Sequence, residues 1–322
     1  MKRNYRFVIL ATVLTAAVAA LPAAVAQNMP AERNPTKVRS KISIYDIGDK
    51  SVRVVYTADT LWEAPNWSLD GKYLLANTGG KLYRFALDSR QSKPEALNLD
   101  AGYVCNNDHG LSADGKLLAF SANFGAKASQ VFIASADGSS PRLMTPDSPS
   151  YFHGWSPDGK WLAFVAERGG NWDIYRVAAA GGEEERLTSN PGYDDGPDYS
   201  PDGKWIYINT DRAGTWDIWR FPADGAGAAD VNAERITSDE LEDWFPHPSP
   251  DGKWLVFLSF PKSTKGHDVK TNIQLRMLPM GDVTKARPSK VVELFGGQGT
   301  INVNSWSPDS TRFAFVSYEV LP

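Results

Sequence analysis

A short turn motif recurs six times in this chain, and its spacing constrains the fold more than any other feature. The copies are Ser68-Leu-Asp-Gly-Lys72, Ser112-Ala-Asp-Gly-Lys116, Ser156-Pro-Asp-Gly-Lys160, Ser200-Pro-Asp-Gly-Lys204, Ser249-Pro-Asp-Gly-Lys253 and Ser307-Pro-Asp-Ser310. Their aspartates lie 44, 44, 44, 49 and 58 residues apart. A period of this length indicates a repeat architecture, in which each unit buries its hydrophobic face against its neighbours.

The motif is typical of a tight turn between two strands. Proline at its second position presets φ, aspartate caps the local backbone, and glycine supplies a left-handed residue. Apolar strands follow the turns, as in Trp161-Leu-Ala-Phe-Val165 and Trp205-Ile-Tyr-Ile208. Residues 172–177 and 185–188 then provide a third and a fourth strand. Four short strands in each repeat predict one blade of a β-propeller.

The two ends of the chain supply complementary parts of one further blade. Only one strand follows Ser307-Pro-Asp-Ser310, whereas residues 41–46 and 51–56 look like third and fourth strands without their first two. Pairing the two ends closes the ring and removes open sheet edges. We therefore predict an all-β fold over residues 40–322: a six-bladed β-propeller of four-stranded blades, with the last blade shared by the N- and C-terminal strands.

The first 26 residues have the pattern of an export signal. Basic residues open the chain, residues 7–21 are apolar, and Ala24-Val25-Ala26 provides the small residues that precede cleavage at Gln27. The apolar stretch is short for a membrane span. Residues 27–39 are polar and contain proline, which indicates a flexible lead-in. We expect a mature protein without a membrane span, located in the periplasm or secreted.

Composition narrows the classes of partner. The chain carries 34 Lys and Arg against 38 Asp and Glu, a formal charge of −4, and no basic cluster, so we expect no nucleic-acid partner. Its single cysteine, Cys105, excludes an internal disulfide framework and a cysteine-based metal cage. The 11 Trp, 12 Tyr and 14 Phe are sufficient for a large core. We expect a monomer.

The full repeat resembles that of a known family. Ser-Pro-Asp-Gly-Lys-Trp is followed by Asp-Ile-Tyr, then Gly-Gly, then Arg-Leu-Thr, most clearly in residues 156–188. This pattern is similar to the TolB-type (WD40-like) propeller repeat, and the resemblance covers residues 41–322. It implies a periplasmic envelope protein. TolB carries an α/β domain before its propeller, and we expect this chain to lack it, because few residues separate Gln27 from the first strand.

The family resemblance also directs attention to the central channel of the ring. A propeller usually binds its ligand at a channel mouth, where the loops from each outer strand lead into the next inner strand. Counting back from each repeat serine places polar residues there, and His267 lies in an enlarged loop expected on the same face. The candidate ligand-binding residues are Glu63, Asn107, Asp108, His109, His153, Asp194, Asp195, Asp198, Asp243, His247, His267, Asn302 and Asn304.

The histidines are the most specific part of this set. We predict that they converge on one pocket, where at least one has a pKa shifted by a neighbouring carboxylate. Imidazole and carboxylate suit a divalent metal such as Zn²⁺, Mn²⁺ or Ca²⁺, although no cofactor is required by the pattern. The metal candidates are His109, His153 and His247. The alternative is that each imidazole only joins neighbouring blades, and that the acidic pairs are solvated loop charges.

Two functions are compatible with such a funnel. The first is a non-catalytic binding module of the cell envelope that recognises a protein segment or a glycan. The second is a carbohydrate-active enzyme, either a metal-dependent lyase or a glycoside hydrolase with two facing carboxylates. No Gly-x-Ser-x-Gly motif of an α/β-hydrolase is present in the sequence. Aromatic residues near the mouth are candidates for stacking on sugars or peptide side chains: Trp62, Tyr151, Phe152, Trp244 and Phe245.

Overall fold

Each copy of the turn motif is held by hydrogen bonds of its own serine and aspartate in the structure, a computed structural model that describes residues 37–87, 93–283 and 285–322. In the third copy, Ser156 Oγ donates to Asp158 Oδ1 over 2.7 Å, while the backbone N–H of Trp161 donates to Ser156 Oγ over 2.9 Å. Gly159 has a φ of 69°, which glycine adopts without steric cost. The predicted turn therefore joins the first and second strands of the blade.

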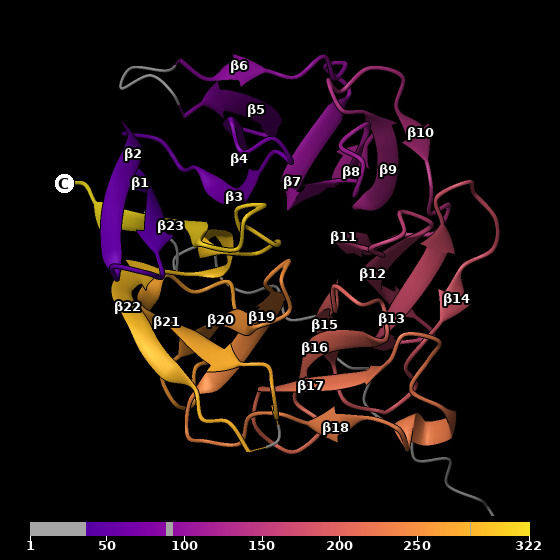
Figure 1. The fold of residues 1–322 in the computed structure, drawn as a ribbon. Helices are drawn as coiled ribbons and strands as arrows, with labels where there is room; N and C mark the ends of the chain where they lie inside the picture. The colour runs from indigo at the N-terminus through magenta and orange to yellow at the C-terminus, as the bar shows by residue number, and fades with distance from the viewer. Residues whose placement is uncertain (1–36, 88–92, 284) are drawn as a thin grey trace, which may run out of the picture. The chain divides into compact units, whose positions relative to one another are not determined.

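Six blades surround a central channel in the described residues, as predicted (Figure 1). Five are four-stranded antiparallel sheets. Blade 1 contains β3 (Glu63–Trp67), β4 (Tyr73–Thr78), β5 (Lys81–Ala86) and β6 (Glu95–Ala96). Blade 2 contains β7 (Tyr103–Leu111), β8 (Leu117–Phe124), β9 (Gln130–Ser135) and β10 (Arg142–Leu143), and blade 3 contains β11 (Ser150–Trp155), β12 (Trp161–Arg168), β13 (Asn171–Ala178) and β14 (Glu185–Arg186).

The next two blades repeat this order. Blade 4 contains β15 (Asp194–Tyr199), β16 (Trp205–Thr210), β17 (Asp217–Pro222) and β18 (Glu234–Arg235). Blade 5 contains β19 (Glu242–Pro248), β20 (Trp254–Phe260), β21 (Thr271–Pro279) and β22 (Ser289–Gly296). Two 3₁₀ turns, η2 (Ala228–Asp230) and η3 (Gln298–Thr300), are the helical elements of the described residues, where no helix is long and apolar enough to cross a membrane.

Blade 6 is built from both ends of the chain, which confirms the predicted ring closure. Its second strand, β23 (Arg312–Val320), pairs with β1 (Val38–Asp46), and β1 pairs with β2 (Ser51–Ala58). The innermost strand is reduced to a single bridge between Trp306 and Phe313. The indigo and yellow ends of the ribbon therefore lie side by side in Figure 1. The predicted export signal, residues 1–26, lies outside the described residues, as does the lead-in up to residue 36.

The hydrophobic core is divided among the spaces between blades. Between blades 3 and 4, for example, Val165 of β12 packs with Ile206 and Ile208 of β16 and with Tyr199 of β15. The second strands are buried almost along their whole length, because they lie in the middle of a blade that is covered on both faces. This packing leaves the innermost strands to line the channel.

Candidate functional site

A break in pairing register near the middle of the innermost strand is common to blades 1 to 5. The shifts fall between Cys105 and His109 in β7, between Phe152 and Gly154 in β11, and at the corresponding points of β3, β15 and β19. A β-bulge of this kind leaves residues unpaired and re-aims their side chains. The polar candidates of these strands lie in or beside the bulges.

Three of the bulges have a local sequence cause. Ala64, Gly196 and Phe245 have φ values of 52°, 62° and 54°, and each precedes a proline. Proline has no N–H to donate to the ladder, so pairing is interrupted there. Glycine is required at the second site, because a Cβ on Gly196 would lie 2.6 Å from Asn209 Oδ1. A proline three residues before the repeat serine was thus a sequence signal for the bulge.

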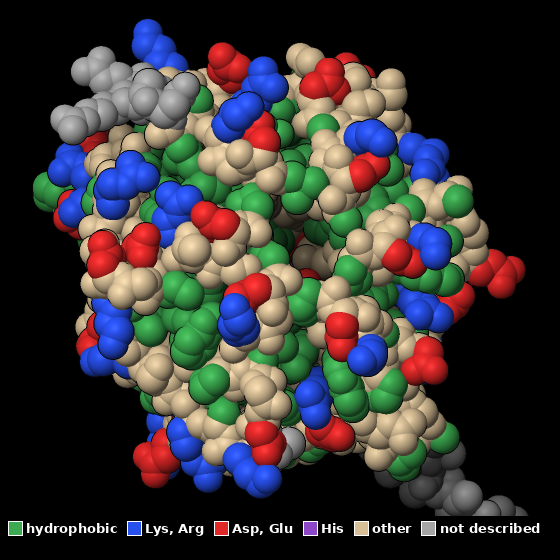
Figure 2. Space-filling model, viewed as in Figure 1, with side chains coloured by type: hydrophobic (Ala, Val, Ile, Leu, Met, Phe, Trp, Pro, Cys, Tyr) green, Lys and Arg blue, Asp and Glu red, His purple; other side chains and the backbone are tan. Residues whose placement is uncertain are grey.

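The channel opens on the face of the turn motifs through a cavity of about 260 Å³, which we call the turn-side chamber. Figure 2 shows a hollow at the centre of this face, surrounded by paired acidic and basic side chains. Within the turn motifs, Asp158 forms an ion pair with Lys160 and Asp202 with Lys204. Equivalent residues of successive repeats form the apolar rim: Leu69, Ala113, Pro157, Pro201, Pro250 and Pro308.

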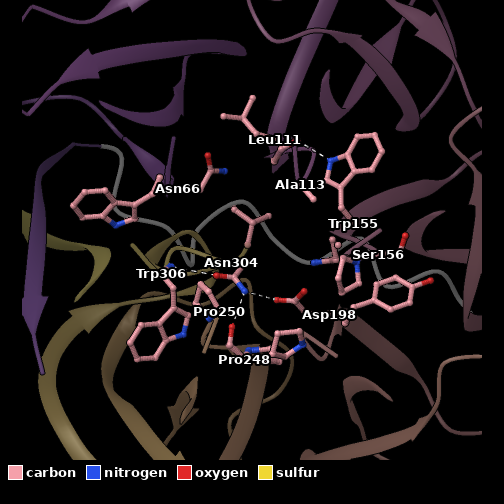
Figure 3. A pocket seen from close by; sticks show the side chains of 18 of the residues that line it. Asn66, Leu111, Ala113, Trp155, Ser156, Asp198, Pro248, Pro250, Asn304 and Trp306 are labelled. Atoms are coloured by element: carbon pink, nitrogen blue, oxygen red, sulfur yellow. Dashed lines mark hydrogen bonds between the residues drawn. The ribbon is translucent and has the colours of Figure 1, made fainter. Parts of the chain in front are cut away.

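Deeper in the turn-side chamber, polar side chains of different blades bind one another (Figure 3). Asn66 Nδ2 donates to the backbone oxygen of His109 over 2.7 Å and lies 2.9 Å from His109 Nδ1. Asn304 Nδ2 donates to Asp198 Oδ2 over 3.0 Å. Burial lowers the pKa of His109 to about 3, so its imidazole is neutral. With Nδ1 accepting from Asn66, the proton resides on Nε2, which has no partner among the described residues.

The opposite end of the inner strands borders a second cavity of about 310 Å³, which we call the funnel chamber. It receives side chains from blades 2 to 5 and from the segment after β22. His153 lines both chambers and so lies between them. The residues of the funnel chamber are Asn106, Asn107, Asp108, Tyr151, His153, Val165, Trp172, Tyr193, Asp195, His267, Asp268 and Gln298.

Three buried ionisable groups determine the electrostatics of the funnel chamber. His153 Nε2 lies 3.2 Å from Asp195 Oδ1. Burial lowers the pKa of His153, but Asp195 and Asp108 outweigh that effect and raise it overall. For Asp195, burial raises the pKa, but the interaction with His153 outweighs this effect and the pKa is lowered overall. Asp108 differs, because burial raises its pKa to about 7 despite the Asn302 amide that donates to it. The chamber thus combines an ion pair with a carboxyl that titrates near neutrality.

One side of the funnel chamber is aromatic. The rings of Tyr151 and Trp172 have centroids 5.9 Å apart, and those of Trp172 and Tyr193 are 5.5 Å apart at an interplanar angle of 30°. All three side chains are partly exposed. Trp172 is the second residue of β13, the third strand of its blade, and Trp216 holds the same repeat position one blade later. Alignment of the third strands would have identified Trp172 from the sequence, whereas Gln298 and Asp268 have no repeat signal.

The four histidines do not share one pocket. His109 lies in the turn-side chamber, His267 lies in the funnel chamber, and only His153 contributes to both. His247 borders neither, since its Nδ1 lies 3.0 Å from Asp198 Oδ2 and its Nε2 donates to the backbone oxygen of Ile301 over 2.8 Å.

A metal site built on His109, His153 and His247 does not fit this arrangement. Both ring nitrogens of His247 are engaged by protein oxygens, which leaves none for a metal ion. Within the part of the chain that the structure describes, no three His, Cys, Asp or Glu side chains are grouped so as to hold a metal.

Several other predicted residues have structural partners away from both cavities. Asp194 accepts two hydrogen bonds from Arg212, and Asp243 accepts one from Ser259 and lies 3.3 Å from Arg276. Glu63 packs against Gly299, and burial raises its pKa. These acidic residues lie on the inner strands rather than in the channel-entry loops predicted for them, and they do not line either chamber.

Most of the aromatic residues predicted to stack on a ligand are instead buried in the core. Trp62, Phe152, Trp244 and Phe245 are at most 4 % exposed and belong to the core between blades, although Phe152 also borders the turn-side chamber. Phe245 supports the site indirectly, because its ring stacks on His153 with centroids 5.8 Å apart. Tyr151 is the one member of that set that lines the funnel chamber.

Comparison with known proteins agrees with the repeat signature. The model of the TolB beta propeller domain matches residues 148–289. A protein of Agrobacterium fabrum, Uncharacterized protein Atu1656, is 45% identical over 283 residues, which is 87% of this chain and 93% of that protein. A solved structure from Agrobacterium tumefaciens, of a candidate TolB, is 43% identical with a TM-score of 0.83 and covers 88% of this chain and 99% of that one. The chain belongs to the TolB β-propeller family.

The TolB-type propeller here also resembles more distant structures in fold alone. TolB from Acinetobacter baumannii superposes with a TM-score of 0.59 at 18% identity, covering 78% of this chain and 63% of that protein. Oligogalacturonate lyase in complex with manganese superposes with a TM-score of 0.51 at 13% identity, covering 78% and 72%. The same blade architecture therefore occurs in proteins named as TolB and in enzymes. The choice between a binding and a catalytic function must be argued from the residues of the site.

Proposed function

We propose that this protein is an exported, non-catalytic binding module of the cell envelope, whose channel takes up a protein segment or a glycan. One observation carries the proposal. The funnel chamber combines partly exposed aromatic rings with buried polar atoms that have no hydrogen-bond partner among the described residues, namely Nδ1 of His153 and Nδ1 of His267. Pockets with apolar walls and a few convergent polar groups are typical ligand sites. Export is supported by the signal-like residues 1–26.

Nucleophilic catalysis has little support in the described residues. Burial raises the pKa of the Cys105 thiol to about 12, so it stays protonated and unreactive at physiological pH. His153 is committed to Asp195 and faces no serine or threonine hydroxyl in the lining of the funnel chamber. A lyase reaction through a metal held by His109, His153 and His247 gains no support either, because these three imidazoles are not grouped.

The test is capture of envelope components by the mature, immobilised protein. We expect the wild type to retain partners that the double variant His153→Gln/Asp195→Asn loses, since both side chains line the chamber and Gln and Asn keep their approximate volumes. Asp224→Asn, an exposed residue beside the turn motifs, is the matched control. Protease treatment of the extract before capture distinguishes a protein partner from a glycan. Equal recovery with wild type and double variant, both shown to melt cooperatively, would remove the channel from consideration.

The second candidate function is a carbohydrate-active enzyme. The observation in its favour is Asp108, a carboxyl with a pKa of about 7 in the same cavity as the carboxylate of Asp195. A proton donor and an ionised carboxylate in one cavity are what a glycoside hydrolase requires. A polysaccharide screen that follows both reducing ends and the absorbance of unsaturated uronates tests this function. Product formed by the wild type but not by Asp108→Asn would favour the enzyme over the binding module.

A further inference from the structure

The lining of the funnel chamber is unbalanced in charge. Three carboxyl groups border it, those of Asp108, Asp195 and Asp268, and no Lys or Arg is among the described residues that line it. His153 pairs with Asp195, which leaves Asp108 with the neutral amide of Asn302 as its hydrogen-bond donor. Asp108 is only 2 % exposed. The charged form of a nearly buried carboxyl is unfavourable when its hydrogen-bond donor is neutral and the neighbouring His153 is shared with Asp195, and a ligand that brings a positive charge would relieve it.

The aromatic rings of the chamber lead to the same conclusion by a contrast within the molecule. Elsewhere in the repeats an arginine covers the exposed face of a tryptophan, with Arg176 4.2 Å from the centroid of Trp161 and Arg220 4.1 Å from that of Trp205. No Lys or Arg of the described residues lies over Tyr151, Trp172 or Tyr193. The exposed parts of these rings are therefore not covered by a cation of the described residues and can accept one from outside the chain.

We propose that the funnel chamber binds the guanidinium group of an arginine side chain presented by a protein segment. A planar guanidinium can stack on Trp172 or Tyr193 and at the same time donate hydrogen bonds to Asp108, which a compact ammonium group does less well. The chamber of about 310 Å³ lies at the small end of ligand pockets, which suits one side chain rather than a sugar chain. An acidic glycan would meet carboxyl groups and no Lys or Arg among the described lining residues, which disfavours its binding. This inference rests on the proposed binding function and selects the protein segment over the glycan.

The experiment compares two peptides that differ in charge but hardly in shape. Acetyl-Gly-Arg-Gly-amide and acetyl-Gly-citrulline-Gly-amide are titrated against the mature full-length protein in a buffer that contains a chelator, with binding followed by heat and by tryptophan fluorescence. We expect the arginine peptide to bind about tenfold or more tightly than the citrulline peptide, with the lysine analogue between them. An oligogalacturonate, as an anionic glycan, should not compete.

Variants localise the effect. Asp108→Asn and Trp172→Leu should each weaken arginine-peptide binding by about tenfold and bring it near that of the citrulline peptide. Asp268→Asn alters a largely exposed carboxyl and so keeps the fold while lowering affinity less. Asp224→Asn, beside the turn motifs, should leave the affinity unchanged.

Two results would overturn the inference. One is equal affinity of the arginine and citrulline peptides, or equal affinity of the wild type and the folded variants Asp108→Asn and Trp172→Leu for the arginine peptide. The other is absence of arginine-peptide binding to the folded wild-type protein, whether or not the oligogalacturonate binds. In either case, if capture of envelope components still depends on His153 and Asp195, the proposed binding function stands with a different ligand. If capture is unaffected by those substitutions, both the arginine inference and the proposed binding function of the channel are wrong.

Discussion

Asp108 and His109 are consecutive buried residues of β7, yet burial moves their pKa values in opposite directions. The pKa of Asp108 is raised to about 7 and that of His109 is lowered to about 3. Both shifts favour the neutral form, because removing a charge from water is unfavourable whatever its sign. The ordinary value is 3.8 for the aspartate and 6.5 for the histidine. The two residues therefore make opposite contributions to the pH dependence of stability.

The Asp108 contribution can be isolated with Asp108→Asn. Between its ordinary pKa of 3.8 and its folded pKa of about 7, the unfolded state releases the proton while the folded state keeps it, so stability falls as pH rises and the loss is complete above about pH 7. The amide variant removes this loss. We expect its free energy of unfolding to exceed that of the wild type by about 4 kcal/mol at alkaline pH and to match it near the ordinary pKa. Urea unfolding across pH measures the difference, and an equal or smaller value for the variant at alkaline pH would contradict the assigned pKa.

At the scale of the element, β15 shows how one strand directs neighbouring acids to different surroundings, one inside the blade and one at the channel. Successive side chains of a strand point to opposite faces. Asp194 consequently meets Arg212, at 2.8 and 2.9 Å, while its neighbour Asp195 meets His153 at the channel. Arg212 also binds Asp230 of η2 over 2.9 Å. Asp194, Arg212 and Asp230 therefore form a buried charge network inside blade 4.

Asp194→Asn should therefore affect folding and not binding. It leaves Arg212 with one carboxylate partner in a nearly buried position, which we expect to lower the free energy of unfolding by about 2–3 kcal/mol. Recovery of envelope partners at a temperature where the variant is folded should equal that of the wild type. Chemical denaturation and the capture assay provide the two readouts. Lost capture by folded Asp194→Asn would place this residue in the site after all.

At the scale of the whole molecule, the ring depends on strands that are distant in sequence. β1 and β23 pair along nine residues each, from Val38 with Val320 to Asp46 with Arg312. The central residues of both strands are buried, and Ile42 is fully enclosed between them and blade 1. Because the paired segments come from the two ends, the last blade forms only when the chain has closed.

Removal of residues 40–56 should consequently open the ring. The deletion exposes the edge of β23 and its apolar residues, such as Phe313 and Phe315, and an unpaired edge of this kind promotes association. We expect aggregated protein with no cooperative melting transition, as judged by size-exclusion chromatography and calorimetry. Val54→Ser, at a half-exposed position of the outer strand β2, is the control and should remain a folded protein. A soluble deletion protein that melts cooperatively would contradict the closure.

Local chemistry explains how far the sequence could predict the fold. The turn motif depends on residues five positions apart or fewer, as in the bonds of Ser156 to Asp158 and Trp161, so it can be recognised without tertiary information. Repetition then requires each blade to cover the next, and the half-blades at the two ends have only each other to pair with. The six-bladed closed ring and the family followed from these features alone.

The identity of the channel-lining side chains was decided only by the tertiary structure. The side chains of a strand alternate with a period of two, but a bulge in the middle of the strand breaks that count, so the face taken by His153 or His247 cannot be read from its distance to the turn. Contacts between different strands and blades mattered equally. Asp198 of blade 4 pairs with His247 of blade 5, and Trp172 lines the funnel chamber although it belongs to a third strand. Such choices depend on burial and partners far away in sequence, and these exist only once the blades have closed around the channel.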